Sequence, residues 1–182
     1  MLVLVLSDAH IPDRATCVHA KFHKLWDPRK INQVVTLGNV GDAHTMQLIK
    51  SITTDPQSVK GEFDLSPLPL TKVISQAGLR IGLVSGFSVI PNDDPDALLI
   101  MARQLDVDIL LWGGSHQLEV YELENKLFVN PGSCTGASPA SGEQVTPSFV
   151  LLDIQTNSCV VYIYSIVNGT ELKVENATFK KE

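Results

Sequence analysis

Cysteine is scarce in this sequence, which argues against a fold held together by disulfides. The three cysteines, Cys17, Cys134 and Cys159, are odd in number and widely spaced. Neither a disulfide framework nor a zinc knuckle is therefore expected. We interpret them as buried or unreactive thiols of a protein from a reducing compartment, which predicts a cytoplasmic location.

Long apolar runs and clusters of basic residues are also missing. The apolar stretch 1–6 leads directly into Ser7 and Asp8, so we interpret it as a strand and not as a signal peptide or membrane span. The formal net charge is -6, which predicts no nucleic-acid partner and no direct membrane insertion. Hydrophobic residues make up 44% and charged residues 19% of the 182 residues. We therefore expect one globular domain over 1–182.

Short apolar runs followed by turn residues predict the secondary structure of the first half. Runs that are apolar on both faces, and so predict buried strands, occupy residues 2–6, 33–37, 79–84 and 108–112. Helical patterns are present at 20–26, 43–52 and 95–105. For the last of these, Asp94 is a suitable N-cap and Pro95 suits the first helical position.

The second half of the chain has the turn signals of antiparallel hairpins. These are Ala77-Gly78, Glu124-Asn125-Lys126 and Asn168-Gly169, each between two apolar runs. The first half thus predicts alternating strands and helices, and the second half predicts mostly antiparallel strands. Both are satisfied by an α/β fold with two mixed β-sheets packed face to face and flanked by helices.

Polar residues gather just past the carboxyl ends of the predicted strands, where ligands bind in open α/β sheets. The series is Asp8-Ala9-His10, Gly38-Asn39, Gly61-Glu62-Phe63-Asp64, Ser85-Gly86, Gly113-Gly114-Ser115-His116 and Asn130-Pro131-Gly132-Ser133. Each piece alone is weak, and His10 by itself would be interpreted as a loop histidine before a ligand. The specific feature is the order of the series along successive strands.

This series resembles the calcineurin-like metallophosphoesterases. Their pattern is Asp-x-His, Gly-Asp, Gly-Asn-His-Asp, Gly-His and Gly-His-x-His, each at a strand end. The resemblance implies a site in which two divalent metals activate a water and polarise a phosphoryl group. By this resemblance one metal would be bound by Asp8, His10, Asn39 and His116, and the other by Asn39, Glu62, Ser85 and Gly114.

The departures from that pattern predict a degenerate site. Gly114 has no side chain, Ser85 is a poor neutral ligand, and the bridging position holds the neutral Asn39. The general acid of the family falls at Phe63, which cannot transfer a proton. We therefore expect no enzymatic activity, no required cofactor, and at most one weakly bound Zn²⁺ or Mn²⁺ ion.

Other motifs resemble the family of the small subunit of retromer, the cytosolic complex that retrieves cargo from endosomes to the Golgi and plasma membrane. They cover the whole chain and comprise 1–6, Asp8, His10-Ile11-Pro12, Gly61-x-Phe63-Asp64, 106–110, Asn130-Pro131-Gly132-Ser133 and 147–151. The resemblance implies a non-catalytic scaffold, peripheral on endosomes through the complex. Its partners would be the C-terminal half of retromer's long α-solenoid subunit and endosomal regulatory proteins.

Two apolar segments are candidates for those contacts. Val89 and Ile90 follow Ser85 closely, and they belong either to a loop buried in the core or to an exposed anchor, which the resemblance assigns to the solenoid subunit. Tyr162 and Tyr164 share one face of a predicted strand, and that face is either covered or exposed. The resemblance assigns to regulators an exposed patch of Leu2, Leu25, Leu151, Tyr162, Tyr164 and Val174.

Three functional hypotheses remain open at this point. The leading one is an interaction subunit of a retromer-like coat. Its rival is a weak phosphoesterase that uses one metal, and Phe63 and Gly114 count against it. The third is a binding module whose surface is ordered by a metal ion without chemistry, and the surviving set Asp8, His10, Asn39 and His116 is compatible with it.

Overall fold

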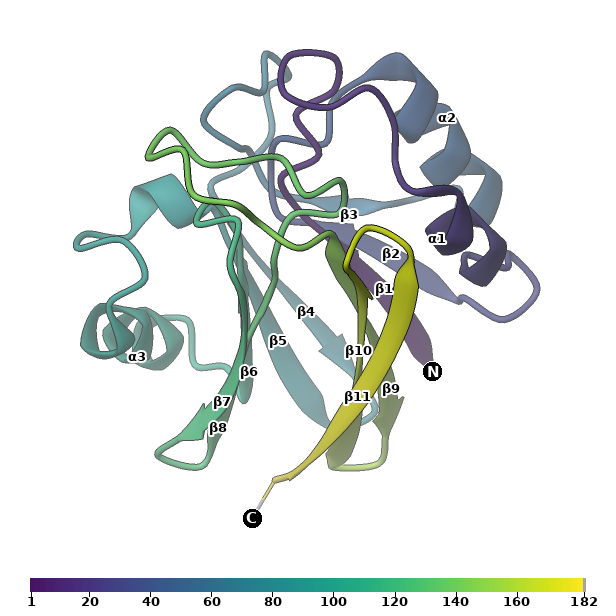
Figure 1. The fold of residues 1–182 in the computed structure, drawn as a ribbon. Helices are drawn as coiled ribbons and strands as arrows, with labels where there is room; N and C mark the ends of the chain where they lie inside the picture. The colour runs from purple at the N-terminus through teal and green to yellow at the C-terminus, as the bar shows by residue number, and fades with distance from the viewer. Residues whose placement is uncertain (182) are drawn as a thin grey trace.

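Two mixed β-sheets pack face to face, with helices on their outer faces (Figure 1). The structure is a computed structural model and describes residues 1–181. The arrangement confirms the predicted α/β fold of two mixed sheets flanked by helices.

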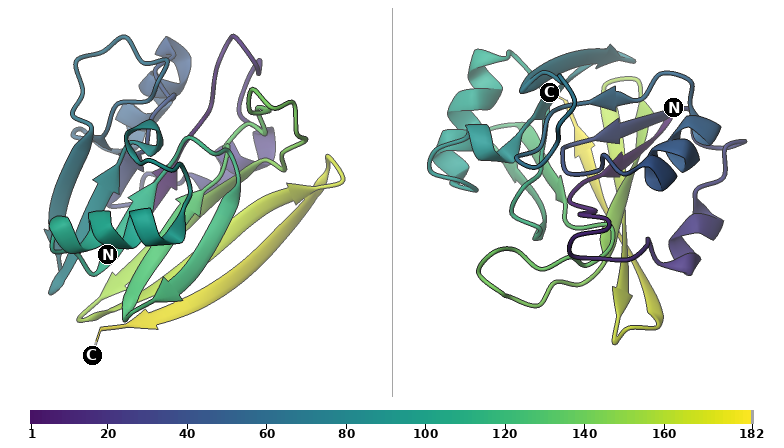
Figure 2. Two further views of the ribbon diagram at one scale, coloured as in Figure 1. Left: turned by 90° about the vertical axis from the view of Figure 1, so that its left-hand side faces the viewer. Right: turned by 90° about the horizontal axis from the view of Figure 1, so that it is seen from above.

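The larger sheet has six strands and combines parallel and antiparallel pairs. In spatial order it contains β11 (Glu171–Lys180), β10 (Ser158–Val167), β9 (Ser148–Gln155), β1 (Leu2–Leu6), β2 (Gln33–Thr36) and β3 (Gln57–Ser58). β1, β2 and β3 run parallel, whereas β9, β10 and β11 form an antiparallel meander. Figure 2 shows β11 as the outermost strand of this sheet.

The smaller sheet has five strands and is also mixed. In spatial order it contains β4 (Thr71–Gln76), β5 (Leu79–Val84), β6 (Ile109–Trp112), β8 (Lys126–Pro131) and β7 (Leu118–Leu123). β5, β6 and β8 are parallel. The predicted hairpins at Ala77-Gly78 and Glu124-Asn125 join β4 to β5 and β7 to β8. Each of these turns has a residue at positive φ, Gly78 at 85° and Asn125 at 57°, as such tight connections require.

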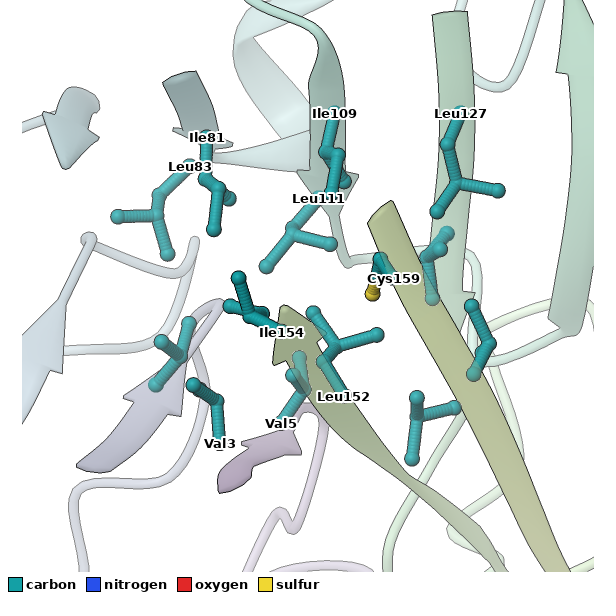
Figure 3. Packing of buried hydrophobic residues seen from close by; sticks show 14 of the residues in the cluster. Val3, Val5, Ile81, Leu83, Ile109, Leu111, Leu127, Leu152, Ile154 and Cys159 are labelled. Carbon is teal, nitrogen blue, oxygen red and sulfur yellow. The ribbon is translucent and has the colours of Figure 1, made fainter. Parts of the chain in front are cut away.

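The main hydrophobic core fills the space between the two sheets (Figure 3). Aliphatic side chains from both sheets are fully enclosed there, among them Val3, Val5, Ile81, Leu83, Ile109, Leu111, Leu152 and Ile154. The central strands of both sheets are apolar on both faces because helices cover their outer faces. Burial of this apolar area is the largest favourable term in the folding of the chain.

Three α-helices cover the outer faces, and their limits follow from capping. They are α1 (Ala20–Leu25), α2 (Ala43–Ile52) and α3 (Pro95–Gln104). The Asp42 carboxylate accepts the N–H of Thr45 at the start of α2, and Asp94 accepts that of Ala97 at the start of α3, which satisfies donors without an intrahelical partner. α1 and α2 pack on the larger sheet, and α3 packs on the smaller one. Among residues 1–181, no helix has the length and apolarity needed to cross a membrane.

The cysteines are unpaired, as expected. Cys134 and Cys159 are buried, whereas Cys17 is exposed. Burial raises the pKa of the Cys159 thiol to about 12 and that of Cys134 further still, so both remain protonated and unreactive at neutral pH.

Candidate metal centre

The carboxyl ends of the parallel strands converge at one end of the molecule, opposite the start of β1 (Figure 1). Asp8 and His10 follow β1, Asn39 follows β2, and His116 follows β6. All four have positive φ, between 45° for His10 and 65° for His116. Such angles are uncommon for residues other than glycine, and they gather at functional sites where the surroundings hold the backbone.

Three of these side chains form one cluster. A ligand atom of each of Asp8, His10 and His116 lies within 4.8 Å of the other two. The Asp8 Oδ1 atom is 3.7 Å from Nε2 of His10 and 3.9 Å from Nε2 of His116. The two imidazole rings stack, with their centroids 4.8 Å apart. Three of the four residues predicted to bind the first metal therefore lie close enough together to bind one ion.

The Asp8 carboxylate is fully buried and held in its ionised form. Oδ2 accepts hydrogen bonds from Ser7 Oγ at 2.9 Å and from the Gly114 N–H at 2.8 Å. Burial alone would raise the pKa of Asp8, but the neighbouring His10 and His116 and the hydrogen bonds from Asn39 and the Gly114 N–H lower it below its usual value. A buried carboxylate kept ionised is a suitable anionic ligand for a divalent cation.

The two histidines each leave one nitrogen free for an ion. Nδ1 of His116 lies 2.7 Å from the carbonyl oxygen of Ala137 and must donate to it. Nε2 of His116 is then the ring nitrogen that could face an ion, and it lies towards Asp8. Nε2 of His10 is buried and has no hydrogen-bond partner in the described chain. Two imidazoles and one carboxylate fit one Zn²⁺ or Mn²⁺ ion.

Asn39 is oriented in a way that the sequence did not reveal. Its Oδ1 accepts the N–H of Phe63 at 3.0 Å, which fixes the orientation of the amide because a backbone N–H can only donate. Its Nδ2 then donates to Asp8 Oδ1 at 2.9 Å. In this orientation Asn39 gives the cluster a donor rather than a lone pair, so it positions Asp8 and does not complete a four-ligand set.

The residues at the second-metal positions offer few ligand groups. Glu62 is exposed, and Ser85 is buried with no partner for Oγ in the described chain. Gly114 offers only its backbone N–H, to Asp8. Its φ of 96° lies in a region that L side chains rarely adopt, so a ligating side chain there would be strained.

Val89 and Ile90 have opposite environments. Val89 is 3% exposed and packs in the cluster beneath α3, whereas Ile90 is 87% exposed. The expectation that both form an exposed anchor is therefore wrong for Val89. Ile90 borders a groove of about 270 Å³ beside α3, which Ile100 and Met101 also line. Ile100 is 54% exposed, and the sequence analysis did not identify it as a surface residue. In a short helix an exposed isoleucine cannot be told from a core isoleucine by its spacing alone.

The strand register places the predicted regulator patch on one face of the larger sheet. Leu151 pairs with Tyr162, and Tyr164 pairs with Val174. Leu2, Leu25, Tyr162 and Tyr164 are half-buried, and Val174 is 50% exposed. Leu151 is only 6% exposed, so its assignment to the exposed patch is wrong. It lies beside Tyr162 on the same sheet face and is buried in the apolar cluster that includes Phe22 of α1.

The family model for the calcineurin-like phosphoesterase superfamily domain matches residues 1–157. The chain belongs to this superfamily, in agreement with its paired mixed sheets and its polar strand ends.

Within the superfamily the chain belongs to the vacuolar protein sorting-associated protein 29 (Vps29) family. It is 44% identical to that protein of Schizosaccharomyces pombe over 100% of this chain and 99% of the relative. Vps29 of Chaetomium thermophilum has a crystal structure with a TM-score of 0.94, 43% identity and full coverage of both chains. Wild-type Vps29 of Entamoeba histolytica, solved in complex with Zn²⁺, is 38% identical with a TM-score of 0.92, covering 99% of this chain and 100% of that one.

Proposed function

We propose that this protein is a non-catalytic scaffold subunit of a retromer-like complex. It docks on the long α-solenoid subunit and recruits regulators for the retrieval of cargo from endosomes to the Golgi and plasma membrane. Membership of the Vps29 family supports this assignment. In this proposal residues 1–182 act as one domain, located in the cytoplasm and peripheral on endosomes.

The absence of catalysis in this proposal follows from chemistry at three positions. Phe63 occupies the general-acid position and has no proton to transfer. The second-metal positions offer the neutral Ser85 and the bare backbone of Gly114. One ion alone cannot clamp both the attacking and the leaving oxygen of a phosphoester, as two-metal sites do.

The main support for the proposed solenoid-docking surface is the exposure of Ile90. A large aliphatic side chain that is 87% exposed, next to an apolar groove lined by Ile100 and Met101, is typical of an interface anchor. The loop backbone beneath it is fixed because Val89 is buried in the α3 cluster. Ile90 is therefore presented on a rigid support, which reduces the entropy lost on binding.

The regulator surface in this proposal is the outer face of the β9–β11 meander. Tyr162, Tyr164 and Val174 expose apolar area there, and Leu2 and Leu25 extend it towards α1. Tyrosine suits such a surface because its ring buries apolar area while its hydroxyl remains in water. Leu151 lies beside Tyr162 across the strand pair and supports its ring from there.

The cluster of Asp8, His10 and His116 favours a second role, as a metal-ordered binding surface. Its geometry fits one ion, and a zinc complex exists for the Entamoeba histolytica relative. An ion would tie β1 to β6 and so order the strand-end surface without performing chemistry. The alternative is a weak phosphoesterase that works with one metal and uses the same residues. A measurement of phosphoester turnover distinguishes the two roles.

The deciding experiment is Ile90→Asp, with Val174→Asp as a matched control on the opposite surface. Binding to the purified C-terminal half of the solenoid subunit is measured by calorimetry, and folding by thermal melting. We expect Ile90→Asp to abolish solenoid binding with an unchanged melt, because the charge is stranded only in the complex. Val174→Asp keeps solenoid binding. Unchanged binding by a folded Ile90→Asp variant would exclude this surface as the docking site.

A further inference from the structure

Two separate hollows open on either side of the candidate metal centre. His116 lines one of about 200 Å³, and His10 lines the other, of about 360 Å³. Asn39 and Phe63 line both, and Asp8 lines neither. Asn39 and Phe63 are thus the wall shared by the two hollows, and the three ligating groups lie at or behind that wall.

The Phe63 side chain is the outer part of this wall and is held on two sides. Its ring meets the His10 imidazole edge-on, with centroids 5.4 Å apart and an angle of 68°. The Arg14 guanidinium carbon lies 5.0 Å from the centroid of the same ring. Arg14 is itself fixed by a hydrogen bond from Nη1 to the Ser138 carbonyl at 3.1 Å. Ring and cation contacts of these kinds are attractive.

The ligating side chains are closed to solvent when the ring is in this position. The exposed fractions of the Asp8, His10 and His116 side chains are 0%, 3% and 4%. A hydrated ion cannot reach all three through such openings, so some side chain must move. Asn39 is held at both ends of its amide, whereas Phe63 is 54% exposed and borders both hollows.

We propose that Phe63, held by Arg14, is a gate that controls the rate at which an ion enters and leaves the cluster of Asp8, His10 and His116. Rotation of the ring joins the two hollows and uncovers His10. The ring supplies no ligand, so the gate changes both rates by the same factor and leaves the affinity unchanged. This inference rests on the proposed one-ion site, and it gives Phe63 a role beyond the loss of a general acid.

The test measures zinc exchange rather than activity. Zinc release from the loaded full-length protein to a fluorescent chelator, and zinc uptake by the apo protein, are followed by stopped flow. Phe63→Ala is expected to speed both rates by roughly tenfold, as the loss of two contacts of this size implies, with no change in Kd from calorimetry. Phe63→Trp, which restores a ring, should return both rates towards those of the wild type.

Two controls separate the gate from general loosening of the site. Phe87→Ala removes another exposed ring that lines the His116 hollow, and it should leave both rates unchanged. Arg14→Ala removes the cation behind the ring and should speed both rates less than Phe63→Ala does.

Each contrary result has a distinct meaning. If Phe63→Ala leaves both rates unchanged, the gate is excluded while the one-ion site stands. If Phe63→Ala changes Kd, Phe63 belongs to the binding site itself and is not a gate. If the wild-type protein binds no Zn²⁺, both the site and the gate are excluded.

Discussion

Asn39 donates its amide nitrogen to Asp8 Oδ1 at 2.9 Å while its own oxygen accepts the Phe63 N–H at 3.0 Å. A carboxylate at position 39 would keep the second contact but not the first, because it has no proton to donate. Two buried carboxylates facing each other repel unless a cation or a shared proton lies between them. The neutral amide therefore gives the buried Asp8 carboxylate a hydrogen-bond donor that needs no metal ion.

Asn39→Asp is expected to make stability depend on metal. In chelator the variant should lose about 3 kcal/mol of unfolding free energy, because it leaves an uncompensated buried charge. Zn²⁺ should restore most of this loss. Asn39→Ala is the control: it loses the hydrogen bonds to Asp8 and from the Phe63 N–H but gains no charge, so Zn²⁺ should not stabilise it more than it stabilises the wild type. Urea unfolding with and without metal measures the effect, and equal stability of Asn39→Asp and wild type in chelator would contradict it.

The protein is expected to be inactive towards aryl phosphates in the presence of Mn²⁺. Phe63→His restores a general acid, but it should not restore turnover, because Ser85 and Gly114 still leave the second metal without ligands. Product release is measured against a His10→Ala background, which removes the first metal as well. Hydrolysis by the wild-type protein that disappears in His10→Ala would overturn this expectation.

Leu151→Glu and Val174→Glu are expected to behave differently although both lie on the same sheet face. Leu151 is 6% exposed, so a glutamate there buries an unpaired charge and should cost about 3 kcal/mol or more. Val174 is 50% exposed, and the same change should alter stability by less than about 0.5 kcal/mol while weakening regulator binding. Thermal melts of the two variants decide, and a wild-type melt for Leu151→Glu would show that its site opens readily to water.

Asp93→Asn is expected to stabilise the protein at neutral pH. Burial, the larger effect, raises the pKa of Asp93, and a hydrogen bond from Trp112 Nε1 at 2.7 Å only partly opposes it. A carboxyl whose folded pKa is raised stabilises the fold at low pH and loses that contribution as the pH rises through its folded pKa. An asparagine keeps the acceptor for Trp112 and tolerates the φ of 57° at this position.

The melting temperature of Asp93→Asn relative to wild type should therefore increase as the pH rises through the acidic range and then level off. Asp96→Asn, which replaces an exposed aspartate in the first turn of α3, serves as the control and should show no such rise. A constant difference between Asp93→Asn and wild type at all pH values would mean that Asp93 does not titrate differently in the folded state.

Sequence periodicity and turn chemistry predicted the elements well. The strands at 2–6 and 79–84, the helix at 43–52 and the Asp94 cap are found where they were expected. These features depend on neighbours close in the chain, so local patterns carry the information. The family resemblance of the strand-end series implied that Asp8, His10 and His116 share a site, and the structure groups them although β1 and β6 belong to different sheets.

Only the tertiary structure decided which apolar residues face water. Alternation along β10 places Tyr162 and Tyr164 on one face, but it does not say how far α1 covers that face, and so it could not separate buried Leu151 from exposed Val174. In the same way, nothing local distinguishes Val89 from Ile90. The packing of α3 buries Val89 and leaves Ile90 in water. Burial depends on contacts between residues that are distant in the chain, and these contacts exist only in the folded protein.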